Sequence, residues 1–378
     1  MRNGIGWILS GICLVILTGT VSCRRSFSSP PTGPYPAPTS TATPQWRPVG
    51  TPGISLNSIV SSSLQVHDGA PYVAFGDTML TGWTRAMRFD GGAWVNVGAP
   101  GFSEGPIDYA SLWLDGDTPY VAFKDNANGD RVTVMRCVGG IWNFVGGPGF
   151  SRGEAEFVSL CVDGGTPYVA YSDSYTGYLA SVMKFNGTDW VDVGLYGFTP
   201  DQAFCTSLYI SGGIPYVAFY DQYNYGMASV MKFDGADWVN VGDPGFSPGG
   251  VWYTSLSIEG GVPYVAFSDY PNDNKATVMR FNGTSWVLVG TAGFSESQAD
   301  LTSLSIDGGV PYVAYVDAAH EFRATVKRFD GAGWVGVGEP GFSADGIWDL
   351  SLDVDLGIPY VSYSDSSLGN RLCVMKYE

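Results

Sequence analysis

The sequence predicts an all-β protein folded as a seven-bladed β-propeller, with four antiparallel strands in each blade. Its composition, an internal repeat and the complementary content of its two ends each support this prediction. The 378 residues include 52 Gly and 23 Pro, and 14% of them are aromatic. Residues of these types favour short strands joined by tight turns, so we expect almost no helix.

A repeat runs through the chain without insertion or deletion. The tripeptide Pro-Tyr-Val recurs every 48 residues, and its tyrosines are Tyr72, Tyr120, Tyr168, Tyr216, Tyr264, Tyr312 and Tyr360. A tryptophan recurs at the same spacing, as Trp46, Trp94, Trp142, Trp190, Trp238, Trp286 and Trp334. Periods of about 20–50 residues indicate propeller blades or solenoid turns.

Each repeat has room for four strands, which the sixth copy illustrates. The predicted strands are Ser303–Asp307, Pro311–Asp317, Ala324–Phe329 and Trp334–Gly338. Gly308 and Gly309 supply the positive φ angles of a tight hairpin turn between the first two strands.

The two ends of the array indicate a closed ring. The segment 46–50 is an isolated fourth strand, whereas the last copy supplies three strands and stops at Glu378. Pairing the two would complete a seventh blade and remove both open edges. Pro48 agrees with this arrangement, because an edge strand tolerates a missing backbone donor. A solenoid would instead need distinct polar caps.

The repeat over residues 46–378 resembles bacterial propeller repeats, and in length and layout it is similar to kelch-type blades. The segment Phe89-Asp90-Gly91 followed by Trp94 is similar to the kelch turn between the third and fourth strands. This resemblance implies the same propeller fold.

The first 45 residues are predicted to be a leader and a tether. Residues 1–22 have the features of a secretory signal, and the following Cys23 resembles the lipidated cysteine of a bacterial lipoprotein. Ordinary cleavage after Ser22 is the alternative. Residues 23–45 are rich in Pro, Ser and Thr and predict an extended spacer. We therefore expect export to the periplasm or cell exterior, with membrane contact only through a lipid anchor.

The charge excludes one class of partner. The formal net charge is -17, whereas nucleic-acid binding requires clustered Lys and Arg. We expect a monomer that binds a carbohydrate or a protein, without a cofactor.

Sequence variation among the copies is concentrated on one face of the predicted ring. The stretches after the second and fourth strands vary, and alternating strand directions place both on the same face. Loops on a rigid scaffold commonly carry binding residues, although they can also be merely unconstrained. Aromatic side chains there would suit sugar stacking or a protein contact, while those near the first strand could instead fill the channel. The candidate binding residues are Trp83, Tyr175, Tyr178, Tyr223, Tyr225, Trp252, Tyr253, Tyr270 and Trp348.

The same face carries a ring of aspartates, one at the end of each second strand. These are Asp77, Asp125, Asp173, Asp221, Asp269, Asp317 and Asp365. We expect them to accept hydrogen bonds within their own loops, because seven equivalent positions are too far apart to share one ion. A recognition or cation site is the alternative, and we predict no metal site.

Catalysis is not the favoured interpretation. The only histidines, His67 and His320, are predicted on opposite faces, which excludes a His-rich metal centre. The leading hypothesis is a non-catalytic binding or scaffold propeller. The alternative is a glycan-cleaving enzyme that uses carboxylates of the variable face.

Overall fold

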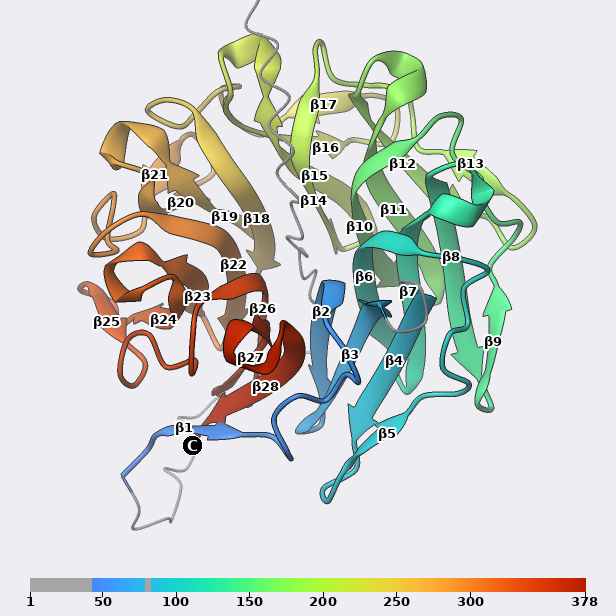
Figure 1. Cartoon of the computed structure of the whole chain (residues 1–378). Helices are drawn as coiled ribbons and strands as arrows, with labels where there is room; N and C mark the ends of the chain where they lie inside the picture. Colours follow the sequence, from blue (N-terminus) through green and yellow to red (C-terminus); the bar gives the residue numbers. More distant parts are fainter. Residues whose placement is uncertain (1–42, 79–82) are drawn as a thin grey trace, which may run out of the picture.

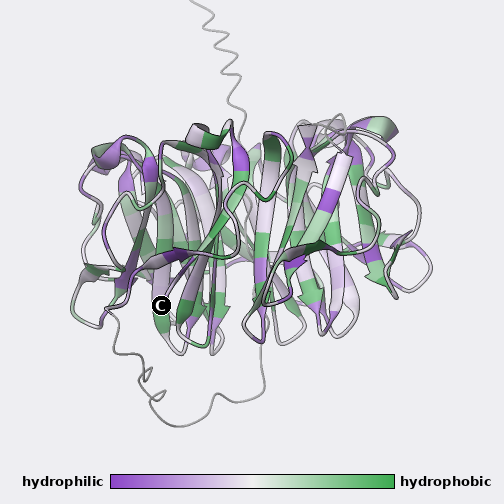
Figure 2. Ribbon diagram, turned by 60° about the horizontal axis from the view of Figure 1, so that its bottom comes forward, coloured by the Kyte–Doolittle hydropathy of each residue, from purple (hydrophilic) through white to green (hydrophobic). Residues whose placement is uncertain are grey.

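The computed structural model describes residues 43–78 and 83–378, which form seven four-stranded antiparallel sheets arranged as blades around a central axis (Figure 1). The predicted all-β, seven-bladed propeller is thereby confirmed. From the side the ring is a disc, with the short helical turns along one rim and tight hairpin turns along the other (Figure 2). We call the rim with the helical turns the upper face.

The first strand of each blade is innermost and begins at the upper face. These strands are β2 (Ile59–His67), β6 (Ile107–Asp115), β10 (Ala155–Asp163), β14 (Ala203–Ser211), β18 (Val251–Glu259), β22 (Ala299–Asp307) and β26 (Ile347–Asp355). Each is adjacent to the inner strands of its two neighbours, so together they surround the axis.

The second and third strands form the middle of each blade. The second strands are β3 (Ala70–Asp77), β7 (Thr118–Asp125), β11 (Thr166–Asp173), β15 (Ile214–Asp221), β19 (Val262–Asp269), β23 (Val310–Asp317) and β27 (Ile358–Asp365). The third strands are β4 (Trp83–Phe89), β8 (Arg131–Val138), β12 (Leu179–Phe185), β16 (Met227–Phe233), β20 (Lys275–Phe281), β24 (Arg323–Phe329) and β28 (Arg371–Tyr377).

The outermost strands are short, and helical turns connect the second strand to the third. The outer strands are β1 (Trp46–Pro48), β5 (Trp94–Asn96), β9 (Ile141–Phe144), β13 (Trp190–Asp192), β17 (Trp238–Asn240), β21 (Trp286–Leu288) and β25 (Trp334–Gly336). The 3₁₀ turns of blades 2 to 7 are η2 (Asn126–Asn128), η3 (Ser174–Thr176), η4 (Gln222–Asn224), η5 (Tyr270–Asn272), η6 (Ala318–His320) and η7 (Ser366–Leu368).

Closure of the ring occurs as the sequence predicts. The seventh sheet has the order β1-β28-β27-β26, and Pro48 of β1 lies opposite Met375 of β28. Backbone bonds extend this pairing on both sides: Gln45 N–H donates to Glu378 at 2.9 Å, and Val49 N–H donates to Val374 at 2.9 Å. The two ends of the array therefore share one blade.

An inner ring of hydrogen bonds joins the blades around the axis. In each inner strand a buried serine Oγ accepts the backbone N–H of a leucine in the next blade, at 2.8–3.2 Å. The acceptors are Ser63, Ser111, Ser159, Ser207, Ser255, Ser303 and Ser351. The last of these receives Leu64 N–H of blade 1, so the ring is complete.

An outer ring is made by the repeated tryptophans. Each indole Nε1–H donates to a valine carbonyl of the preceding blade at 2.6–2.7 Å. Six of the seven indoles also stack on a phenylalanine of that blade, with centroids 3.9–4.1 Å apart. Trp46 closes this ring too, because it donates to Val337 and stacks on Phe342.

The predicted strand bounds were wrong mainly at the start of the inner strand. The sixth copy begins its first strand at Ala299 rather than Ser303. Its pairing with β23 shifts register between Asp300 and Ser303, and every blade has a bulge at the equivalent place. A bulge inserts an extra residue and interrupts the side-chain alternation. Residues 299–302 therefore lack the alternating pattern that predicts a strand.

The inner ring can be tested by removing one acceptor. We expect Ser207→Ala to lower the free energy of unfolding by about 1–3 kcal/mol, because Leu256 N–H is left buried without its acceptor. Chemical denaturation measures the effect. Exposed Ser285 is the control, and its replacement by alanine should stay within about 0.5 kcal/mol of the wild type. Equal stability of the two variants would contradict the proposed role of the serine.

Candidate functional site

The ring of seven aspartates is buried beneath the upper face. These side chains are only 0–2% exposed. In blades 2, 3, 4, 6 and 7 the carboxylate accepts a backbone N–H of the following 3₁₀ turn, and in blade 5 Asp269 accepts from the side chains of Asn272 and Thr277. In blade 1 the partner of Asp77 is Arg85, at 2.8 Å. In blades 2 to 7 the carboxylates therefore hold their own loops, and in blade 1 Asp77 pairs with Arg85 of the third strand.

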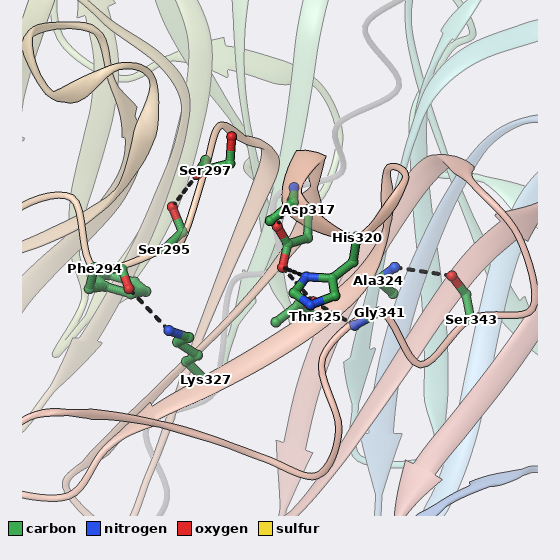
Figure 3. A network of polar contacts seen from close by, with 11 residues as sticks. Phe294, Ser295, Ser297, Asp317, His320, Ala324, Thr325, Lys327, Gly341 and Ser343 are labelled. Atoms are coloured by element: carbon green, nitrogen blue, oxygen red, sulfur yellow. Dashed lines mark hydrogen bonds and ion pairs between the residues drawn. The ribbon is translucent and has the colours of Figure 1, made fainter.

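Blade 6 shows this arrangement in detail (Figure 3). Asp317 accepts from Ala319 N–H at 3.0 Å and from Thr325 Oγ1 at 2.9 Å, and His320 Nδ1 lies 2.9 Å from its Oδ2. Thr325 Oγ1 in turn accepts Gly341 N–H at 2.8 Å. His320 thus belongs to a network that fixes the loop.

The aromatic candidates occupy two levels of the upper face. Tyr175, Tyr223 and Tyr270 lie in the 3₁₀ turns and are exposed, whereas Tyr178 and Tyr225 follow the turns in the left-handed conformation. The placement of the other four in loops was wrong, because they lie at the upper ends of strands. These are Trp83 in β4, Trp252 and Tyr253 in β18, and Trp348 in β26. The inner-strand bulge extends the strand over the last three.

The bulge also changes the backbone conformation at the upper end of the inner strand. The third residue of that strand has a positive φ in five blades, at Tyr109, Phe157, Cys205, Tyr253 and Leu301. Such angles are uncommon for residues with a Cβ. The backbone thereby changes the direction of the residues at this level, which differ from blade to blade.

An arc of aromatic rings follows this level through blades 2 to 5. Tyr109 and Phe157 have ring centroids 5.4 Å apart, and Phe157 lies 6.0 Å from Phe204. Tyr220 of β15 continues the arc, at 5.6 Å from Phe204 and 5.1 Å from Trp252. Trp252 is 42% exposed, while the other four are half-buried. These five residues, with their polar neighbours Asp108, Lys124 and Glu156, are called the channel mouth below.

A polar cluster lies at the blade 2 end of the arc. Glu156 accepts from Lys124 Nζ at 2.8 Å and from the Tyr109 hydroxyl at 2.6 Å. Burial, assisted by the Glu156 charge, raises the pKa of Tyr109. Burial would lower the pKa of Lys124, but the bond to Glu156 and the charges of Glu156, Asp130 and Asp108 together outweigh it and raise that pKa. This triad connects blades 2 and 3.

Two further carboxyls at the same level are protonated more readily than usual. Burial raises the pKa of Asp108, and nearby Lys124 opposes this shift. Burial also raises the pKa of Asp300, whose two oxygens each lie 3.0 Å from the Gln298 amide nitrogen. The upper ends of the inner strands thus offer aromatic faces together with hydrogen-bonding groups.

Further along the inner strands, large aromatic side chains are buried. Trp113 of β6 and Tyr209 of β14 occupy equivalent inner-strand positions, and both are almost fully buried in the same core cluster. Tyr109 of the arc packs against this cluster, which therefore supports the blade 2 end of the arc.

Several mouth residues were missed by the sequence reasoning. Asp108, Lys124, Glu156 and Tyr220 lie within strands, whereas the predicted candidates were placed mainly in loops. One signal was available. The second position of the inner strand holds a different kind of residue in most copies, and the facing position in the second strand also varies.

Other site classes receive no support from the described part of the chain. Among residues 43–78 and 83–378, no group of three His, Cys, Asp or Glu side chains could hold a metal ion. Cys137, Cys161, Cys205 and Cys373 are buried free thiols. No helix in the described ranges is long and apolar enough to cross a membrane. The predicted lipidation site Cys23 lies outside the described residues.

Comparison with known proteins shows the fold alone. No protein-family model and no curated protein matches the chain. A protein of unknown function from Dyadobacter fermentans is similar, with a TM-score of 0.51 and 14% identity, covering 89% of this chain and 100% of that one. The kelch resemblance stays a prediction.

Two other solved structures are similar at a lower level. YjhT has a TM-score of 0.49 at 12% identity, covering 74% of this chain and 97% of its own. The Aleuria aurantia lectin in complex with alpha-methyl-L-fucoside has a TM-score of 0.49 at 16% identity, with 76% and 96% covered. Neither likeness assigns a ligand to this protein.

The raised pKa of Asp108 gives a test of the mouth electrostatics. Because the folded pKa exceeds the unfolded value of about 3.8, ionised Asp108 destabilises the fold at neutral pH. The destabilisation decreases as the pH falls through the folded pKa. We expect Asp108→Asn to raise the melting temperature at pH 7, with a difference that shrinks toward pH 4.

Asp90 is a matched control of opposite sign. Backbone N–H groups of Ala93 and Gly92 lower its pKa, so its stabilisation is present at neutral pH and is lost on acidification. Asp90→Asn should therefore not raise the melting temperature at pH 7. A fall in the melting temperature of Asp108→Asn at that pH would contradict the assignment.

Proposed function

We propose that this protein is an exported, non-catalytic binding propeller whose channel mouth binds a neutral carbohydrate. The observation that carries this proposal is the aromatic arc from Tyr109 to Trp252. Aromatic faces suit the apolar faces of sugar rings, and the neighbouring acids and amides suit hydroxyl groups.

The position of the arc supports a binding role rather than a packing role. Packing positions repeat from blade to blade, as the serine and tryptophan rings show. At the second position of the inner strand, by contrast, Asp108, Glu156, Phe204 and Trp252 replace one another in successive blades. Side chains that break the repeat at one site are free to match an asymmetric ligand.

The partial burial of the mouth aromatics favours a sugar over a protein surface. Phe157 and Phe204 are half-buried, so a narrow ligand reaches their rings more readily than a flat partner does. The predicted leader, Cys23 and spacer would hold this monomeric body outside the cytoplasm, where such ligands occur.

Replacing Trp252 tests the proposal. Wild-type protein is screened against an array of neutral and acidic polysaccharides, and we expect binding to neutral ones. Trp252→Ala should weaken this binding at least about tenfold, corresponding to a loss of about 1.4 kcal/mol, because a stacking face is lost. Isothermal titration calorimetry measures the affinity.

Two controls and two adverse outcomes complete this experiment. Trp252→Phe should retain most of the affinity, and replacing exposed Ile141, outside the mouth, by alanine should leave it unchanged. Binding that survives in Trp252→Ala would contradict the site. Polysaccharide cleavage that is abolished by Asp108→Asn or Asp300→Asn would replace the proposal with the glycan-cleaving alternative.

A further inference from the structure

Blade 4 holds an exposed tyrosine in a strained backbone conformation. Tyr225 follows turn η4 with φ of +56°, and its side chain is 88% exposed. The equivalent residue is Gly129, Gly177 and Gly369 in blades 2, 3 and 7, and Asp273 and Glu321, also at positive φ, in blades 5 and 6. A left-handed conformation costs an L-residue roughly 1–2 kcal/mol. An exposed ring recovers little of this cost by burial.

The next residue distinguishes blade 4, because among blades 2 to 7 it alone has glycine there. Gly226 also has a positive φ, and a Cβ there would come within 2.6 Å of the Tyr220 ring. Other blades carry a side chain at this position, as Tyr178 and Phe322 do. Glycine at 226 therefore makes room for the arc residue Tyr220, and the tyrosine at 225 occupies the place where three other blades have glycine.

The strained turn is connected to the channel mouth. Val251 N–H, immediately before Trp252, donates to the Gly226 carbonyl at 2.8 Å. Gly250 has no side chain, and a Cβ there would lie 3.8 Å from the Tyr225 carbonyl. The Tyr220 hydroxyl also lies 3.2 Å from Gln222 Oε1 in η4. The turn of blade 4 is thus hydrogen-bonded directly to the strand of blade 5 that carries Trp252.

We propose that Tyr225 is an outer stacking platform of this site, and that the ligand is a neutral oligosaccharide of at least two sugar units. One unit occupies the mouth against Trp252, and the chain leaves over the turn that carries Tyr225. This inference rests on the proposed function. Of the residues at this turn position in blades 2 to 7, only Tyr225 carries an aromatic ring, and a ring that is 88% exposed fits a ligand contact better than a folding role.

The experiment compares two substitutions at equivalent positions. Tyr225→Gly removes the ring and relieves the strain, and Glu321→Gly does the same for an exposed left-handed residue in blade 6. Calorimetry measures binding of cello- and chito-oligosaccharides with one to six units. Thermal melting reports the stability of each variant.

We expect affinity of the wild type to rise from the monosaccharide to longer oligomers. Tyr225→Gly should weaken oligomer binding about tenfold or more and leave monosaccharide binding unchanged, without lowering the melting temperature. Glu321→Gly should change neither affinity. Tyr225→Asn, with a residue that tolerates the left-handed region, should repeat the result if the glycine variant folds poorly.

The failures of the two proposals are distinguishable. If oligomers bind no better than the monosaccharide, or if Tyr225→Gly binds both equally well, the outer platform is overturned while the mouth site stands. A marked loss of stability in both Tyr225 variants would assign the side chain a structural role. If the wild type binds neither series nor any array member, the proposed function itself fails.

Discussion

The pairing of β1 with β28 is the constraint on which the other interactions depend. Both rings of inter-blade hydrogen bonds are circular, and each requires blade 7 to be complete. Ser351 of that blade accepts from Leu64 of blade 1, and Trp46 donates to Val337 of blade 6. Without closure, two blades would lose a neighbour and β28 would present an open edge. The closed ring is thus what makes the inner strands a rigid support.

Repeated residues lie at the contacts between blades, whereas variable residues lie at the upper ends of the inner strands. Serine and tryptophan recur because every blade meets its neighbour in the same way. At the upper end of the inner strand the bulge interrupts the regular pairing, and the side chains there differ from blade to blade. The differences among Glu156, Phe204 and Trp252 can therefore serve an asymmetric ligand. The repeated residues hold the blades together, and the variable residues form the proposed binding site.

The sequence predicted the architecture well because the signals for blades and closure are local. A constant spacing, hairpin glycines and complementary ends need no knowledge of tertiary contacts. The bulge left no such signal, since it depends on how β22 pairs with β23, and with it Trp252 and Trp348 were misplaced in loops. The Glu156–Lys124 pair was missed for a similar reason, because it joins strands of different blades.

A disulfide across the closing pair tests the central claim most directly. Pro48 and Met375 lie opposite each other in β1 and β28, so cysteines at both positions should form an intramolecular disulfide under mild oxidation and raise the melting temperature. A pair of Pro48→Cys with Met231→Cys, the equivalent position in blade 4, should remain reduced. Failure of the first pair to cross-link, or cross-linking only between molecules, would contradict the closed ring.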